Sequence, residues 1–207
     1  MSKPRVIGGR ARGRALETPK RGTRPTPSRV REAMFDVLAF APRGVFLDLF
    51  AGSGALGLEA ASRGWHAVCV DLAREAAEVI RRNARALGLE VEVRRGDAIA
   101  VAQELRGRVD VCSAAPPYPA DLPAIFQALL DTGCVRPGGR YVFQHPSALA
   151  LELTLEGQPA PIERRAYGSN ALTWVRVPSA ADDDGADDAA NEAAGVARGP
   201  ERAHDAC

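Results

Sequence analysis

The residues between Val45 and Gly57 have the types and spacing of a cofactor-binding loop. An apolar run breaks into a Gly-x-Gly turn that opens a predicted helix, and such a turn lets backbone N–H groups and the positive end of a helix approach a ligand closely. Gly52 and Gly54 suit a turn pressed against that ligand. Asp71 ends the next predicted strand, roughly 20 residues further on, where an acidic side chain can accept hydrogen bonds from ribose hydroxyls. This pairing predicts a cofactor that contains adenosine.

Asp48, which precedes the glycines, separates two classes of adenosine cofactor. A carboxylate at this strand end suits a cofactor with a sulfonium and an amino group, whereas it would repel the pyrophosphate of a nicotinamide dinucleotide. Asp97, after the third predicted strand, suits the adenine edge. Helix N-capping or turn formation is the alternative interpretation of Asp48, Asp71 and Asp97. We predict S-adenosyl-L-methionine as the cofactor, bound by Asp48, Phe50, Ala51, Gly52, Ser53, Gly54, Asp71, Leu72, Asp97 and Ala98.

A second segment, Ala115-Pro116-Pro117-Tyr118, follows the fourth predicted strand as a rigid, carbonyl-rich turn that ends in an aromatic ring. Together with a methyl donor, such a turn indicates methylation of an amino group on a nucleic-acid base. Gln144-His145-Pro146 lies on the same edge of the predicted sheet. His145 is either a helper in proton removal or a structural residue.

Alternating strands and helices must position these segments. Strands that are separated by helical crossovers imply a mainly parallel sheet with helices on both faces. In such an α/β fold the ligand binds at the carboxyl ends of the strands. The two latest segments are expected to form a terminal strand pair. We predict strands over 45–50, 67–71, 91–94, 109–113 and 139–145, a late pair near 163–165 and 172–177, and helices over 53–63, 74–87, 98–105 and 121–132.

Residues 1–44 form a basic extension in front of the sheet. The segment around Arg5 to Gly9 pairs with Ala15-Leu16 in a predicted small hairpin, and a helix capped near Ser28 is expected to follow, with Val30, Met34, Val37 and Leu38 along one face. Arginines interleaved with glycine favour contact with RNA phosphates, and a solvated charged surface is the alternative. The predicted RNA-binding residues are Arg10, Arg12, Arg14, Arg24, Arg29 and Arg31.

Charge divides the chain at residue 178. Residues 178–207 hold eight acidic and two basic side chains, a net charge of −6, so the first 177 residues carry +7 within a total of +1. A basic body favours a phosphate-bearing partner. The tail has almost no large apolar residue and is expected to be disordered. We therefore predict an RNA-binding extension over 1–44, a methyltransferase domain over 45–177 and an acidic tail over 178–207.

The four cysteines are far apart in the sequence, which predicts reduced thiols and no metal site. No segment approaches the ~18 consecutive apolar residues of a membrane span. We expect a cytoplasmic, monomeric protein without a membrane or metal partner.

The sequence of this chain resembles that of one family, the bacterial methyltransferases of guanine N2 in 16S ribosomal RNA, often called RsmD. The resemblance covers residues 5–177 and implies a Rossmann-like class I S-adenosylmethionine-dependent fold with a seven-stranded sheet. It also implies 16S rRNA or the assembling small ribosomal subunit as the partner. It is strongest in Arg5-Val6-Ile7-Gly8-Gly9, in Arg24-Pro25-Thr26 with Arg29-Val30-Arg31-Glu32, and in residues 47–57.

In that family the turn after the fourth strand begins with Asp or Asn, where this chain has Ala115. The exocyclic amine of a base is conjugated to its ring and is a poor nucleophile, so acceptors for its N–H bonds must aim its lone pair at the methyl group. The resemblance implies that Tyr118 stacks on the extruded base and that the Pro116 carbonyl is one acceptor. The predicted catalytic residues are Ala115, Pro116, Pro117 and Tyr118.

Because Ala115 supplies no side-chain acceptor, three interpretations follow; the loss of such a partner costs on the order of 10²–10³ in rate. The enzyme uses the backbone carbonyl and another carboxylate such as Asp121, or it methylates a different amine such as adenine N6, or it binds RNA and cofactor without turnover. We predict an active guanine-N2 methyltransferase, because a binding protein would not need the turn and the cofactor residues together.

Overall fold

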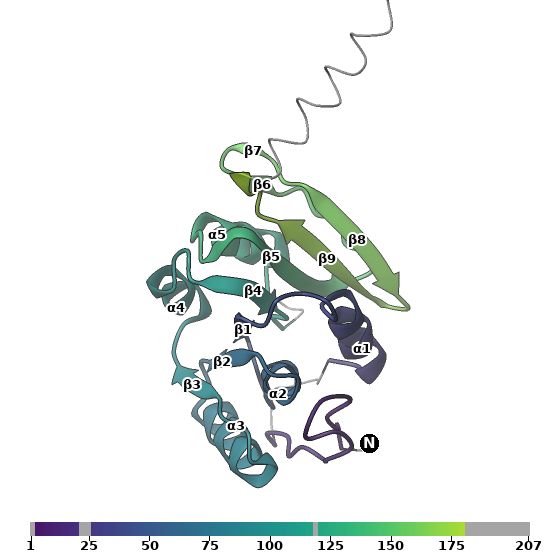
Figure 1. The fold of residues 1–207 in the computed structure, drawn as a ribbon. Helices are drawn as coiled ribbons and strands as arrows, with labels where there is room; N and C mark the ends of the chain where they lie inside the picture. The colour runs from purple at the N-terminus through teal and green to yellow at the C-terminus, as the bar shows by residue number, and fades with distance from the viewer. Residues whose placement is uncertain (1–2, 21–25, 118–119, 181–207) are drawn as a thin grey trace, which may run out of the picture. The chain divides into compact units, whose positions relative to one another are not determined.

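The computed structural model describes residues 3–20, 26–117 and 120–180 and contains one seven-stranded sheet (Figure 1). Its strands are β1 (Val45–Leu49), β2 (His66–Asp71), β3 (Glu92–Arg95), β4 (Val109–Ala114), β5 (Val135–Pro146), β8 (Ile162–Tyr167) and β9 (Asn170–Arg176). They follow the order β3-β2-β1-β4-β5-β9-β8. The pairs among β1 to β5 are parallel, whereas β9 is antiparallel to β5 and to β8. The predicted mainly parallel sheet and its terminal strand pair are therefore confirmed, and β6 (Thr154–Leu155) and β7 (Gln158–Pro159) form a separate small ribbon.

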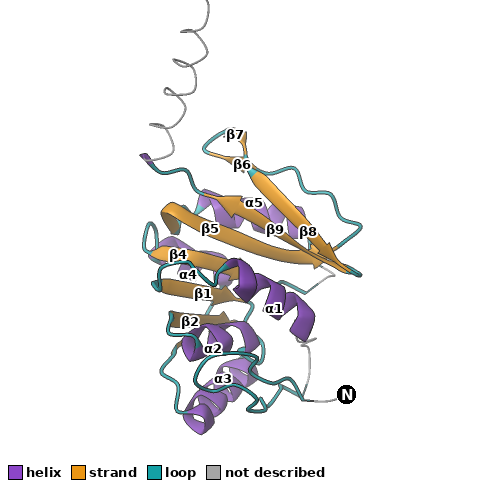
Figure 2. Cartoon of the chain, turned by 45° about the vertical axis from the view of Figure 1, so that its right-hand side comes forward, coloured by secondary structure: helices purple, strands orange, loops and turns teal. Residues whose placement is uncertain are grey.

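Helices cover both faces of the sheet (Figure 2). One face carries α1 (Ser28–Val37), α2 (Ala55–Ser62) and α3 (Arg74–Leu87), and the other carries α4 (Ala98–Glu104) and α5 (Leu122–Asp131). Strand β1 is buried on both faces, because Phe46 packs in the cluster with α1 and α2 while Leu47 and Leu49 pack in the cluster with α4 and α5. This two-sided burial explains why the central strands are continuous apolar runs in the sequence.

The chain leaves β1 and β4 in opposite directions across the sheet. From β1 it proceeds to β2 and β3 at one side, and from β4 it proceeds to β5 at the other. The point where the strand order reverses is the place where open α/β sheets bind ligands, in the crevice outside the carboxyl ends of the strands. The fold therefore places the loop after β1 and the turn after β4 beside each other.

The start of α1 corrects one prediction. The helix begins at Ser28 itself, and the residue before it, Pro27, makes no side-chain capping hydrogen bond. The Pro27 carbonyl instead accepts the N–H groups of Val30 and Arg31 at 3.0 and 3.1 Å. Proline fixes its φ near a value compatible with a helix start, so the Pro27 backbone begins the helix without the cap expected from the Ser28 hydroxyl.

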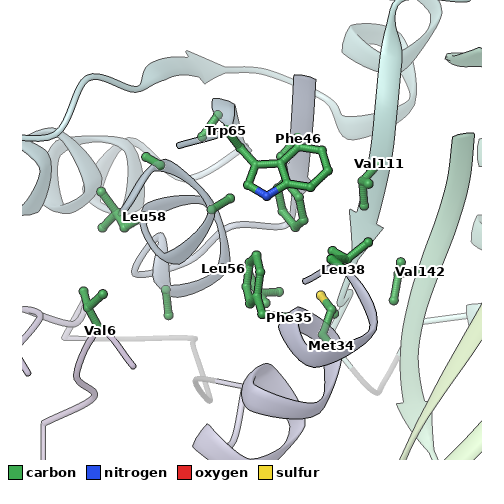
Figure 3. Close-up of a cluster of buried hydrophobic side chains, with 14 of the residues drawn as sticks. Val6, Met34, Phe35, Leu38, Phe46, Leu56, Leu58, Trp65, Val111 and Val142 are labelled. Atoms are coloured by element: carbon green, nitrogen blue, oxygen red, sulfur yellow. The ribbon is translucent and has the colours of Figure 1, made fainter. Parts of the chain in front are cut away.

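The N-terminal segment is part of the main core. Arg5 and Ala15 form a single antiparallel bridge, a reduced form of the predicted hairpin. Val6 and the α1 residues Met34 and Phe35 then pack toward α2 and the sheet (Figure 3). One compact unit accordingly spans Met1–Val177.

Glu59 of α2 ties this segment to the body of the protein. Its side chain is fully buried; Oε2 accepts the backbone N–H of Ile7 at 2.6 Å and Oε1 accepts that of Gly8 at 2.7 Å. The Arg63 Nε donates to Oε1 at 2.8 Å, and Arg31 Nη1 lies 3.8 Å from Oε2. A single carboxylate thus satisfies two backbone donors and faces two guanidinium groups.

Three cysteines, Cys69, Cys112 and Cys134, are buried free thiols, and the reduced state of the chain stays a prediction. Among residues 3–20, 26–117 and 120–180, no helix is long and apolar enough to cross a membrane. Nearly all of the predicted acidic tail, 181–207, lies outside the described residues, so its disorder stays a prediction.

Candidate active site

A cavity of about 680 Å³ lies at the carboxyl ends of β1 and β4. This volume is typical of small-molecule and cofactor sites. Its wall combines the loop after β1, the end of β2 and the turn after β4, which are the three segments that carry the predicted chemistry. The lining residues are Pro19, Thr26, Pro27, Asp48, Phe50, Ala51, Gly52, Ser53, Ala55, Leu56, Asp71, Leu72, Ala73, Glu75, Ala76, Ala115, Pro116, Pro117, Gln144 and Asn170.

The loop after β1 turns sharply because several residues have a positive φ. Gly52 and Gly54 have φ of 57° and 76°, and Phe50 has φ of 61°. This conformation is easy for glycine and costs a residue such as phenylalanine about 1–3 kcal/mol, an arrangement that occurs at ligand-binding sites. The Asp71 Oδ2 accepts the Gly52 N–H at 2.8 Å, and its Oδ1 accepts the Ala73 N–H at 2.8 Å. The Asp71 carboxylate, at the end of β2, therefore holds the loop that follows β1.

Asp48 is buried at the base of the cavity. Its Oδ2 accepts the N–H of Gly57 at 2.9 Å, and burial raises the pKa of Asp48 to about 7, an effect that the hydrogen bond from Gly57 opposes and the nearby Asp71 carboxylate reinforces. A Cβ atom on Gly57 would lie 2.2 Å from the Cys69 Sγ, so only glycine lets α2 approach the sheet at this point. A cationic ligand group beside Asp48 would favour its ionised form.

Most of the predicted cofactor residues lie together at this cavity. Gly54, Asp97 and Ala98 are absent from its lining. Gly54 is the turn residue before α2, Ala98 packs in the core, and the Asp97 Oδ1 accepts the Ala100 N–H at 2.9 Å as the N-cap of α4. The adenine contact predicted for Asp97 and Ala98 stays a prediction. The residues that do line the cavity are Asp48, Phe50, Ala51, Gly52, Ser53, Asp71 and Leu72.

The turn after β4 faces the same cavity. Ala115, Pro116 and Pro117 all line it, whereas Tyr118 lies outside the described residues. Asp121, considered as a substitute carboxylate, is the N-cap of α5, accepts the Ala124 N–H at 3.2 Å and does not line the cavity.

Four lining residues with polar side chains were not among the predicted site residues: Thr26, Glu75, Gln144 and Asn170. Glu75 lies in the first turn of α3. The other three come from the entry to α1, from β5 and from β9, and only the sheet order brings them together. One signal was available for Gln144, a polar residue that ends an apolar strand on the rim of the sheet.

His145 is structural. The side chain is fully buried; its Nδ1 lies 2.9 Å from the Pro146 carbonyl oxygen and its Nε2 lies 2.8 Å from the Thr173 Oγ1. Burial lowers the pKa of His145. Both ring nitrogens are engaged inside the protein, and His145 does not line the cavity, which favours the structural interpretation of this residue.

The prediction that Arg31 contacts RNA is wrong. The residue is 1% exposed, and both of its terminal nitrogens donate to the Arg5 carbonyl at 3.1 Å. Burial lowers the pKa of Arg31, and the nearby Glu59 carboxylate opposes this shift. Arg31 therefore belongs to the internal link with Glu59.

The other predicted RNA contacts differ in position. Arg10, Arg12, Arg14 and Arg29 are exposed, and the Arg14 Nη2 donates to the Ala86 carbonyl at 2.8 Å. Arg24 lies outside the described residues.

A second cavity, of about 360 Å³, lies at the opposite ends of the strands and is lined by residues that include Phe40, Trp65 and Arg136. It contains no predicted site residue. Among the described side chains, no group of three or more His, Cys, Asp or Glu residues could hold a metal ion.

Comparison with known proteins finds relatives for the part of the chain that forms the sheet and the cavity. The sequence profile of the family described as "Conserved hypothetical protein 95" matches residues 4–176. The chain is 41% identical over 99 residues to "Putative rRNA methyltransferase YlbH" of Bacillus subtilis, and 57% identical over 61 residues to "Ribosomal RNA small subunit methyltransferase D" of Escherichia coli. These alignments cover 45% and 28% of this chain and 54% and 31% of the relatives, so the chain spans about half or less of the curated relatives it matches.

A solved structure of a hypothetical protein from Thermus thermophilus is 46% identical, with a TM-score of 0.75 over 84% of this chain and 99% of the other. A second solved structure, "Putative methyltransferase yhhF from Escherichia coli", is 27% identical, with a TM-score of 0.73 over 86% of this chain and 100% of the other. The sheet order, the cavity at the switch point and this likeness agree on a Rossmann-like class I methyltransferase fold. Because the profile match covers most of its length, the chain belongs to the family described as Conserved hypothetical protein 95, the RsmD-type family.

Proposed function

We propose that this protein transfers a methyl group from S-adenosyl-L-methionine to the exocyclic N2 of a guanine in 16S rRNA of the small ribosomal subunit. One observation carries the proposal: a single cavity is lined by the loop after β1, by Asp71 and by Ala115, Pro116 and Pro117. Family membership and the names of two relatives as rRNA methyltransferases support the same activity.

The residues of the cavity fit S-adenosyl-L-methionine. Asp71, held by the Gly52 and Ala73 N–H groups, has further lone pairs for ribose hydroxyls. Leu72 is 70% exposed and offers an apolar surface to the adenine. The buried Asp48 carboxylate suits a ligand with positive charge. When bound, the cofactor supplies an electrophilic methyl group, and the chain supplies orientation.

The turn after β4 would hold the target base. Pro116 is buried in the cavity wall and Pro117 is exposed, so the turn has one side toward the cofactor residues and one toward solvent. Proline rings fix this backbone, so a carbonyl acceptor there would be positioned before the base arrives. Exposed Arg10, Arg12 and Arg29 would contact phosphates, which fixes the position of the RNA but does not select its sequence.

The test is transfer of a labelled methyl group from S-adenosyl-L-methionine to undermethylated small-subunit RNA and to assembling particles, followed by nucleoside digestion and mass identification. N2-methylguanosine is the expected product. N6-methyladenosine would replace guanine by adenine as the target. Measurable cofactor binding without label on any RNA would show an RNA-binding or assembly protein instead.

Asp71→Ala is expected to raise the Kd for S-adenosyl-L-methionine at least tenfold, because it removes a charged acceptor worth about 1.5–3 kcal/mol. The melting temperature of the free protein should fall as well, since the Gly52 and Ala73 N–H groups lose their acceptor. Calorimetric titration and thermal unfolding measure the two effects. Asp36→Ala, at an exposed site on α1, should change neither, and an unaltered Kd in Asp71→Ala would remove Asp71 from the cofactor site.

A further inference from the structure

The cavity wall beside Ala115 carries a connected set of polar side chains. Gln144 is 7% exposed; its Oε1 accepts a hydrogen bond from the Thr26 Oγ1 at 2.8 Å, and its Nε2 donates to the Asn170 Oδ1 at 3.2 Å. Thr26, Gln144 and Asn170 all line the cavity together with Ala115. Because both ends of the carboxamide are held, its orientation is fixed before any ligand arrives.

Strand register places Gln144 next to Ala115. On the parallel strands β4 and β5, Ala114 is the partner of Phe143, and Ala115 and Gln144 are the next residue on each chain. Neighbouring strands lie about 4.8 Å apart, and partners on parallel strands direct their side chains to the same face of the sheet. Ala115 and Gln144 therefore directly follow a paired position on adjacent strands, and both line the cavity.

The target amine needs an acceptor that residue 115 cannot provide. A methyl group accepts no hydrogen bond, whereas a carboxamide oxygen has two lone pairs, of which the Thr26 hydroxyl uses one. Acceptors for the N–H bonds of the exocyclic amine aim its lone pair at the methyl donor. We propose that the Gln144 Oε1 accepts a hydrogen bond from the exocyclic amine of the target base. This inference rests on the proposed function.

Methyl transfer to the amine does not need a basic side chain at position 144. The lone pair of the amine nitrogen forms the N–C bond while the C–S bond breaks, and the sulfur keeps the bonding pair. The nitrogen then loses one N–H proton to solvent water. An amide oxygen is a weak base, so Gln144 orients the amine but does not keep the proton.

Gln144→Met tests this role, because methionine has a similar length and no strong acceptor. With saturating S-adenosyl-L-methionine, the single-turnover rate of methyl transfer to small-subunit RNA should fall on the order of 10²–10³-fold. The cofactor Kd should stay within twofold. Gln144→Glu keeps an acceptor oxygen and should stay within tenfold of the unmodified rate.

Two further variants separate catalysis from structure. Gln127→Met removes a carboxamide that bonds Asp131 and Thr154 away from the cavity lining, and it should leave the rate unchanged. Adding Ala115→Asp to Gln144→Met returns an acceptor from the neighbouring strand and should recover at least tenfold in rate. If Gln144 had a purely structural role, Ala115→Asp would raise the rate by the same factor in the Gln144→Met variant and in the unmodified protein; the proposal expects a larger gain in the Gln144→Met variant.

The outcomes distinguish the inference from the function on which it rests. An active unmodified protein together with a folded Gln144→Met variant of the same rate would overturn the role of Gln144 alone. An unmodified protein that methylates no RNA would overturn the proposed function and this inference with it. If Gln144→Met does not fold, Thr26→Val replaces it, because loss of the hydroxyl frees the carboxamide; a tenfold loss of rate supports the proposal and an unchanged rate contradicts it.

Discussion

Glu59→Ala is expected to lower the free energy of unfolding by about 3–5 kcal/mol, the cost of removing one partner from a buried ion pair. The alanine leaves the buried Arg31 guanidinium without its counter-charge and removes the acceptor of the Ile7 and Gly8 N–H groups. The Arg31 Nε already has no hydrogen-bond partner among the described residues, so no spare interaction is available to compensate.

Urea unfolding followed by circular dichroism measures this loss. The matched control is Glu163→Ala on β8, where the carboxylate pairs with Arg165 but both side chains are more than half exposed; its expected cost is below about 1 kcal/mol. A second control, Glu59→Leu combined with Arg31→Met, removes both charges and should cost less than Glu59→Ala alone. Equal stability of Glu59→Ala and the unmodified protein would show that Glu59 does not anchor the N-terminal segment.

This anchor also explains why one prediction from the sequence was wrong. Arg31 has the same sequence context as its exposed neighbour Arg29, a basic helix start after proline. What distinguishes the two is Glu59, which lies 28 residues away and reaches Arg31 only through the packing of α1 on α2. Charge composition describes a segment as a whole, whereas burial of one arginine depends on a tertiary contact.

The place of the loop after β1 at the cavity could be predicted because it depends on local sequence. Asp48, Gly52 and Asp71 follow from strand ends and a glycine turn, and the parallel topology then brings strand ends to one edge. The connected set of polar side chains on the cavity wall beside Ala115 could not be predicted in this way. Thr26, Gln144 and Asn170 are up to 144 residues apart in the chain, and their contact requires that β9 pairs with β5 in a particular register.

Asp48→Asn is expected to stabilise the cofactor-free protein and to weaken cofactor binding. Burial raises the pKa of Asp48 from 3.8 to about 7, so between these values the folded protein binds a proton that the unfolded chain has lost. The free energy of unfolding therefore decreases as pH rises from about 4 to about 7, by up to about 4 kcal/mol from this group. Asparagine cannot ionise and still offers an acceptor to the Gly57 N–H. Since its buried amide donors cost about 1–3 kcal/mol when unpaired, the net gain at pH 8 should be about 1–3 kcal/mol.

The same substitution should raise the Kd for S-adenosyl-L-methionine at least tenfold at pH 8, because a neutral amide replaces the carboxylate beside the cationic ligand. In the unmodified protein the Kd should decrease as pH rises from 6 to 8, since the cation binds the ionised form, whereas Asp48→Asn should lack this dependence. Urea unfolding and calorimetric titration across this pH range measure both effects, with Asp36→Asn as the exposed control. A pH-independent Kd in the unmodified protein would contradict the link between Asp48 ionisation and binding. A stable Asp48→Asn variant that binds S-adenosyl-L-methionine poorly would show that the buried carboxylate lowers the stability of the free protein but is needed for cofactor binding.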